Sequence, residues 1–283
     1  MANQLCARTL AIVWLFVPAS ACASSGSGDG PKQTTESTTS SGDGDGDPGT
    51  GDGEGDPDDT SIGCTQDVAE ITLITDDGIE LAADLYLPGE VTTTALLLHM
   101  IPPNDKRNYP PGFIALLAED HGLNVINVNR RGAPGSGGES EDGYIGETAR
   151  LDAKAAIDFM ADHPCANGSV VIVGASNGTT GALDMALYAT EQARYDPPTR
   201  MVFLSPGQYT ENQTSLEANL DALVSIPTMF AYPSGEAAWN QAVQAYAPAS
   251  WSFVEYAAGS HGTGLFTSNP ESIAAVASYV AGR

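Results

Sequence analysis

The sequence contains few positive charges, few histidines and few cysteines. Of its 283 residues, 11 are Lys or Arg and 36 are Asp or Glu, which gives a formal net charge of −25 at pH 7. A chain this acidic is repelled by phosphate backbones, so we do not expect nucleic acid as a partner. The four histidines and four cysteines show no zinc-ligand spacing, and we expect neither a metal ion nor a cofactor.

The sequence also lacks an apolar run near its N-terminus that is long enough to span a membrane. The run LAIVWLFV at residues 10–17 follows Arg8 and ends in Ala-Ser-Ala-Cys at residues 19–22. A short apolar core between a positive flank and small residues is typical of an export signal, so residues 1–22 predict a signal peptide. Its end resembles the lipobox of bacterial lipoproteins, with Ala19 in place of the usual leucine. That resemblance implies a lipidated Cys22, and simple secretion is the alternative.

Residues 23–63 have almost no apolar side chains. Ten acidic residues and one lysine lie within 29–59, so this segment carries −9 of the net charge. It cannot bury a core, and it predicts a disordered acidic linker. Its Asp-Gly repeat does not fit an EF-hand calcium loop, because a loop that starts at Asp43 has Pro48 where glycine is required. We expect this linker to hold a domain of residues 64–283 away from a membrane.

The residues after Cys22 also bear on location. Ala23 and Ser24 follow it, without the aspartate that favours inner-membrane retention in the lipoprotein pattern that the segment resembles. We therefore expect an extracytoplasmic protein in the cell envelope, at the outer membrane or cell surface. Cys64 and Cys165 are then the two cysteines left in an exported domain, and an even pair in an oxidising compartment predicts a disulfide.

Residues 64–283 alternate between strand-like and helix-like segments. Eight apolar or alternating runs predict strands at residues 68–75, 79–87, 95–100, 123–129, 170–173, 200–205, 227–232 and 251–257. Helical spacing predicts helices at 112–121, 147–163, 178–194, 237–246 and 271–281. The first two strands form a hairpin around Gly78. Strands that alternate with helices after such an opening predict an α/β fold, with a mostly parallel sheet of about eight strands covered on both faces.

The segment SVVIVGASNGTTGAL at residues 169–183 predicts a strand, a sharp turn and a helix, with Ser176 at the turn. Gly174 and Gly178 provide the room that a strained turn needs where strand and helix pass closely. The turn would hold the serine hydroxyl clear of the sheet and would point the Asn177 amide at a developing oxyanion. The alternative is a plain βα loop with an incidental serine.

A serine nucleophile needs a base, and ligands of parallel sheets bind at the carboxyl ends of the strands. His261 lies in a loop of small residues after the last predicted strand, which makes it the best candidate. His121 and His163 lie at predicted helix ends. His99 also follows a predicted strand. The simpler interpretation of His99 is a structural role, with its ring nitrogens hydrogen-bonded within the fold.

The order serine, acid, histidine, with the serine on a strand-to-helix turn, resembles the α/β-hydrolase superfamily. The resemblance covers about residues 67–283. It rests on HMIPPNDKRNYP (99–110), NVNRRGAPGSGGES (127–140), LSPGQY (204–209), IPTMFAYPSGE (226–236) and GSHGTGLF (259–266). The second motif has Asn129 where the superfamily has an acid. These motifs are similar to the esterase and dienelactone-hydrolase-like branches, and Ser176 points to the serine esterases because dienelactone hydrolases proper use cysteine.

The resemblance implies the remaining members of the site. The acid usually follows the seventh strand, which implies Glu236, and Glu211 after the sixth strand is the runner-up. The oxyanion donors would be the amides of Asn177 and of Ile101 or Met100, since the two prolines that follow have none. Only residues 206–226 separate the sixth and seventh strands, so we expect no large cap domain.

The sequence therefore predicts an extracytoplasmic serine hydrolase that cleaves small-molecule carboxylic esters. Ser176, His261 and Glu236 would form its triad, and an acyl-enzyme would be its intermediate. A thioesterase or peptidase with the same residues is one alternative. A non-catalytic surface-binding protein on a hydrolase fold is the other.

Overall fold

The computed structural model describes residues 64–143 and 146–283. The expected signal peptide with Cys22 and the linker of residues 23–63 lie outside the described residues. Within the described ranges, no helix is both long enough and apolar enough to cross a membrane.

The described domain is built on one sheet of eight strands in the order β1-β2-β4-β3-β5-β6-β7-β8. Two strands run antiparallel to their neighbours, β1 (Gln66–Ile74) and β2 (Glu80–Pro88). The parallel strands are β3 (Thr92–Leu98), β4 (Asn124–Val128), β5 (Ala166–Ala175), β6 (Arg200–Leu204), β7 (Thr228–Pro233) and β8 (Trp251–Tyr256). The fold class, the opening hairpin and all eight predicted strands are confirmed.

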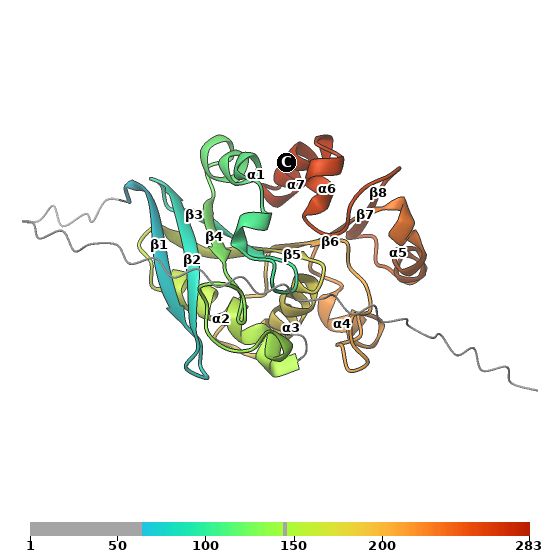
Figure 1. Cartoon of the computed structure of the whole chain (residues 1–283), viewed down its shortest axis with the longest axis horizontal. Coiled ribbons are helices and arrows are strands. Elements are labelled where there is room, and N and C mark those ends of the chain that lie inside the picture. The colour runs from blue at the N-terminus through green and yellow to red at the C-terminus, as the bar shows by residue number, and fades with distance from the viewer. Residues whose placement is uncertain (1–63, 144–145) are drawn as a thin grey trace, which may run out of the picture. The chain divides into compact units, whose positions relative to one another are not determined.

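Helices cover both faces of the sheet, and Figure 1 shows α1, α6 and α7 above it and α2, α3 and α4 below it. The α-helices are α1 (Pro111–Ala115), α2 (Gly146–Ala161), α3 (Gly178–Glu191), α4 (Leu220–Leu223), α5 (Ala237–Gln244), α6 (Gly264–Ser268) and α7 (Glu271–Val280). The short η segments are η1 (Lys106–Asn108), η2 (Leu116–Asp120), η3 (Ser140–Gly143), η4 (Glu217–Asn219) and η5 (Ser234–Glu236). The helix predicted at 112–121 is present as one continuous run, in which α1 passes directly into the π-helical η2.

The apolar runs of the central strands supply a hydrophobic core on each side of the sheet. Along β5, Val171 and Val173 pack in the cluster with α1 and α7, whereas Ile172 packs in the cluster with α2 and α3. Side chains alternate between faces along a strand, so a strand covered on both faces must be apolar throughout. This explains why β5 has a continuous apolar run in the sequence instead of an alternating one.

Two further features define the frame around the candidate site. Cys64 and Cys165 form a disulfide, as predicted, and it joins the start of the domain to the start of β5 across a sequence separation of 101. Between β6 and β7, the described chain has only η4 and α4, with Leu216 and Leu223 buried in the core. The carboxyl ends of the strands are therefore not covered by a large cap.

Candidate active site

Ser176 lies on a sharp turn between β5 and α3. Its backbone has φ +51°, one of two positive values among the described non-glycine residues. Its amide donates to the carbonyl of Leu204 at 2.8 Å, and its carbonyl accepts from the amide of Thr179 at 2.9 Å. A left-handed backbone costs about 1–2 kcal/mol for a residue with a Cβ, so the surrounding contacts must hold it. The strain that the G-x-S-x-G pattern predicted is present.

Gly174 and Gly178 permit this turn because the chain passes itself too closely for any side chain. A Cβ on Gly174 would lie 2.6 Å from the carbonyl oxygen of Gly178. A Cβ on Gly178 would lie 2.3 Å from the carbonyl oxygen of Leu98, at the end of β3. The two glycines therefore allow α3 to pack directly on β5 and β3, which fixes the position of Ser176.

The structure brings Ser176, His261 and Glu236 together. The Nε2 atom of His261 lies 2.6 Å from Oγ of Ser176, and its Nδ1 atom lies 2.6 Å from Oε1 of Glu236. A carboxylate only accepts hydrogen bonds, so Nδ1 carries the proton, and Nε2 of the neutral ring accepts from the serine hydroxyl. The runner-up Glu211 is exposed on the loop after β6, and no contact joins it to His261.

Glu236 lies in an environment that keeps it ionised. Burial raises the pKa of its carboxyl, but the hydrogen bond from His261, together with the nearby Ser205 side chain, outweighs burial and holds this pKa below its usual value. The side chain of Glu236 is 29% exposed and that of His261 is 46% exposed. The carboxylate is therefore charged at neutral pH, and the histidine edge is open to a substrate.

The amides of Asn177 and Ile101 are the predicted oxyanion donors. Neither donates to another backbone carbonyl in the described part of the chain. The Asn177 side chain does not face solvent, because its Oδ1 accepts a hydrogen bond from Nη2 of Arg130 at 3.0 Å. The structure thus leaves both amides available, and their role in catalysis stays a prediction.

His99 and Arg130 form a buried unit behind the oxyanion loop, which sequence reasoning did not connect. The Arg130 amide donates to Nε2 of His99 at 2.9 Å, and the His99 Nδ1 donates to the carbonyl of Met100. Arg130 Nη1 donates to the carbonyl of His99 at 3.1 Å. Burial, and then the charge of Arg130, lower the pKa of His99 to about 3. His99 is therefore a neutral structural residue, and Arg130 ties the loop after β3 to the turn at Asn177.

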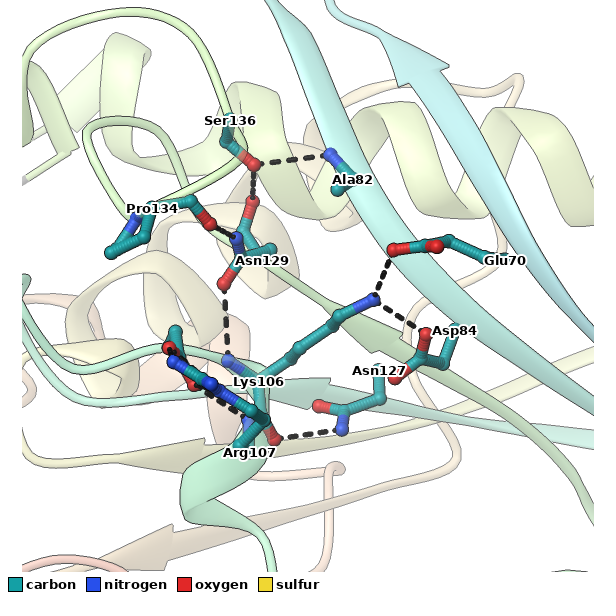
Figure 2. A network of polar contacts seen from close by, with 10 residues as sticks. Glu70, Ala82, Asp84, Lys106, Arg107, Asn127, Asn129, Pro134 and Ser136 are labelled. Atoms are coloured by element: carbon teal, nitrogen blue, oxygen red, sulfur yellow. Dashed lines mark hydrogen bonds and ion pairs between the residues drawn. The ribbon is translucent and has the colours of Figure 1, made fainter. Parts of the chain in front are cut away.

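A second polar network holds the rest of the loop after β3 (Figure 2). Lys106 Nζ lies 2.5 Å from Asp84 on β2 and 3.0 Å from Glu70 on β1. The Lys106 amide donates to Oδ1 of Asn129 at 3.1 Å, and its carbonyl accepts from the side chain of Asn127. The loop that carries Ile101 is thus fastened to β1, β2 and the end of β4.

Tyr209 is a neighbour of His261 whose position at the site the sequence did not indicate. Its hydroxyl donates to the carbonyl of Ser205, and its ring meets the His261 ring edge-on with centroids 6.2 Å apart. Burial raises the pKa of the phenol, so Tyr209 stays protonated. Its position after β6, in LSPGQY, was the only signal in the sequence.

Two cavities adjoin His261. One, of about 340 Å³, is lined by apolar and aromatic residues beside Glu236, among them Tyr209 and Trp239. The other, of about 420 Å³, lies towards the oxyanion loop and includes Met100 and Thr263. Among the described residues, no group of three or more His, Cys, Asp or Glu side chains is arranged to hold a metal ion.

Comparisons with known proteins agree on the fold. Residues 77–199 match the family model of X-Pro dipeptidyl-peptidases (S15 family), a range that includes Ser176 but ends before Glu236 and His261. A search of curated proteins gave no match.

Solved structures of the same architecture include an esterase from Pyrococcus furiosus, with TM-score 0.56 and 16% identity over 77% of this chain and 93% of that one. Dienelactone hydrolase from Anabaena variabilis has TM-score 0.54 and 18% identity over 77% of this chain and 96% of that one. An α/β-hydrolase from a Penicillium species has TM-score 0.56 and 13% identity over 76% of this chain and 98% of that one. The chain therefore has the α/β-hydrolase fold.

Proposed function

We propose that this chain is a serine hydrolase that cleaves carboxylic esters through a Ser176–His261–Glu236 triad. The observation that supports it most directly is the continuous hydrogen-bond chain from the Glu236 carboxylate through His261 to the Ser176 hydroxyl, on a turn with positive φ. Such a chain activates an otherwise weak nucleophile, because the base takes the hydroxyl proton and the acid fixes the tautomer of the base.

The proposed reaction has two stages. Ser176 Oγ attacks the acyl carbon while His261 Nε2 takes its proton, and the amides of Asn177 and Ile101 donate to the oxyanion, each contributing about 3 kcal/mol. The charged Glu236 stabilises the imidazolium. His261 then protonates the leaving alcohol, and a water molecule activated by His261 releases the acyl group from Ser176.

The decisive experiment compares the wild type with Ser176→Ala. The wild type should hydrolyse p-nitrophenyl esters and be labelled by a fluorophosphonate, whereas Ser176→Ala should lose about 10⁴-fold or more in kcat and take no label. Ser169→Ala, at the start of β5 away from the triad, is the matched control and should behave as the wild type. A wild-type protein that takes no label and hydrolyses no ester would instead support a non-catalytic surface-binding protein.

A peptidase is the second candidate, and the match of residues 77–199 to the S15 family model is the observation that favours it. The same residues would attack an amide or a thioester. Matched substrates that share one acyl group, as p-nitrophenyl ester, thioester and p-nitroanilide, separate these activities, and an Xaa-Pro p-nitroanilide tests the dipeptidyl-peptidase reaction. We expect the ester to have the highest kcat/KM.

We also propose that the enzyme is extracytoplasmic and anchored by a lipid on Cys22, with residues 23–63 as the spacer. The small residues before Cys22 and the acidic composition of the spacer support this proposal. Cys22→Ala should move the full-length protein from the membrane fraction to the soluble fraction. A variant that stays with the membranes would place the anchor elsewhere.

A further inference from the structure

Two cavities on the Glu236 side of the site meet at a single side chain. The first, of about 340 Å³, contains His261 and Glu236 in its wall. The second, of about 230 Å³, lies beyond it and is lined by Gln208, Glu217 and Tyr246, among others. Within the described residues, Trp239 is the one residue that lines both cavities. Trp239 therefore lies at the boundary between the cavity at His261 and the second cavity.

The cavity at the triad is suited to an apolar group. Apart from Glu236 and His261, its wall consists of Pro206, Gly207, Tyr209, Ala238 and Trp239. Glu236 is already paired with His261, so the wall offers a substrate mainly apolar surface and two aromatic rings.

The Tyr209 side of this cavity is rigid. The phenol hydroxyl donates to the carbonyl of Ser205, and the Tyr209 amide donates to Oε1 of Gln213 at 2.8 Å. The Gln213 Nε2 donates in turn to the carbonyl of Gly207 at 2.8 Å. These bonds close the segment after β6 on itself and hold the Tyr209 ring in the wall of the cavity.

The Trp239 side is held less firmly by polar contacts. The ring is half-buried on α5 and packs against the core beside its helix neighbour Val243. Its indole N–H donates no hydrogen bond to any group in residues 64–143 or 146–283, unlike that of Trp251, which donates to the carbonyl of Ile226. Its replacement therefore breaks no hydrogen bond, while α5 keeps the bond from Asn240 Nδ2 to the carbonyl of Glu236.

We propose that Trp239 determines specificity by limiting the length of the apolar half of the ester. This inference rests on the proposed ester hydrolysis. An apolar cavity of about 150 Å³ holds a benzene molecule, so the first cavity admits a ring or a short alkyl chain. A longer chain meets the indole ring. With that ring removed, the chain has room to continue into the second cavity. The wall of that cavity is partly polar, with Gln208, Gln213 and Glu217, so each methylene buried there should raise kcat/KM by at most about fourfold.

The test compares wild-type and Trp239→Ala enzymes on two series of esters. One series varies acyl length with a p-nitrophenyl leaving group, and the other varies alcohol length with an acetyl group. For one of the two series, wild-type kcat/KM should fall sharply beyond a limiting length. Trp239→Ala should move that limit by at least two carbons and raise kcat/KM for the longest ester more than tenfold relative to the shortest ester.

Two further variants show whether the ring itself is responsible. Trp239→Phe keeps an aromatic partition and should keep the wild-type limit. Trp239→Ala combined with Tyr246→Trp narrows the second cavity and should cancel most of the gain on long esters. If thermal melting shows that Trp239→Ala does not fold, Trp239→Leu replaces it in the comparison.

The outcomes are distinct. Normal hydrolysis of short esters with the same length limit in wild type and Trp239→Ala, in both series, would overturn this inference alone. A folded wild-type enzyme that hydrolyses no ester would overturn the proposed function and this inference together.

Discussion

Gly262 and Met100 lie so close that a Cβ on Gly262 would be 2.3 Å from the sulfur of Met100. The same Cβ would lie 3.6 Å from Cβ of Ser176. Gly262 has φ +59°, a conformation in which glycine has no steric cost. The residue after His261 therefore allows the histidine loop to rest against the oxyanion loop directly above the serine. This contact couples the positions of the base and of the predicted oxyanion donors.

We predict that Gly262→Ala lowers kcat/KM by up to about 10-fold, because the new methyl group must displace either the Met100 side chain or the His261 loop, and a small displacement of the proposed base is costly. The strained φ should also lower the free energy of unfolding by about 1 kcal/mol. Gly122→Ala is the matched control, since Gly122 has φ +65° and open space around it. That control should lose similar stability and keep full activity.

A double variant isolates the contact. Met100→Ala with Gly262→Ala removes the clash but leaves the backbone strain, so it should recover most of kcat/KM while its stability stays low. Equal activity loss in the single and double variants would show that the strain, and not the Met100 contact, moves His261. Steady-state kinetics and urea unfolding measure the two quantities.

Glu236→Gln should lower kcat by a few orders of magnitude and leave the fold intact. The amide cannot stabilise the imidazolium, and it favours the wrong tautomer of His261. Glu211→Gln is the natural control, because Glu211 is exposed and has no contact with His261. A large loss of kcat in Glu211→Gln with a small loss in Glu236→Gln would assign the acid to Glu211. Small losses of kcat in both variants would show that neither glutamate is the acid of the triad.

The parts of the site that the sequence predicted are those encoded locally. The turn at Ser176 follows from a strand, two glycines and a helix within fifteen residues, and His261 follows the last strand in a loop of small residues. Glu236 was predicted only from the resemblance to the α/β-hydrolase superfamily, because no pattern in the neighbouring sequence distinguishes it from Glu211. Its selection depends on where η5 places the carboxylate relative to the histidine ring.

The parts that the sequence did not predict depend on contacts between distant segments. Arg130 reaches His99 across a separation of 31 residues and Asn177 across 47. Tyr209 lies beside His261 in a segment after β6 that folds back on itself through hydrogen bonds of Gln213 to Tyr209 and Gly207. Neither arrangement produces a periodic pattern or a fixed residue spacing in the sequence. Both arrangements are therefore visible only in the folded structure.

Asn129→Asp should destabilise the protein although it restores the acid of the superfamily pattern. The Asn129 Nδ2 donates to the carbonyl of Pro134 at 2.5 Å, and its Oδ1 accepts from the amide of Lys106 (Figure 2). A carboxylate has no donor for Pro134 and would place two oxygens against each other in a buried site. We expect a loss of about 1–3 kcal/mol in urea unfolding at pH 7.

Asn167→Asp provides the comparison for that change, because Asn167 is exposed at the start of β5. It should alter stability by less than about 0.5 kcal/mol. If Asn129→Asp is as stable as the wild type, the Pro134 bond contributes nothing and the loop tolerates either residue.

His99 gives the stability of this protein a specific pH dependence. Burial, reinforced by Arg130, lowers the pKa of His99 to about 3, whereas a histidine in the unfolded chain has a pKa of about 6.5. Above pH 6.5 both states are neutral at this residue and its contribution is fully present. As the pH falls from 6.5 towards 3, the unfolded state binds a proton that the folded state does not. Stability should therefore fall, by up to about 1.4 kcal/mol per pH unit from this group.

The measurement is urea unfolding of wild type and His99→Gln at several values between pH 4.5 and 6.5, a window above the usual pKa of most carboxyl groups. His99→Gln should be less stable at pH 6.5, because the buried bonds to Arg130 and Met100 are disturbed. Its stability should nevertheless change less steeply with pH, so the two curves converge as the solution becomes more acidic. Parallel curves would mean that His99 takes up a proton in the folded state as readily as in the unfolded chain, and the Arg130 amide would then need another acceptor.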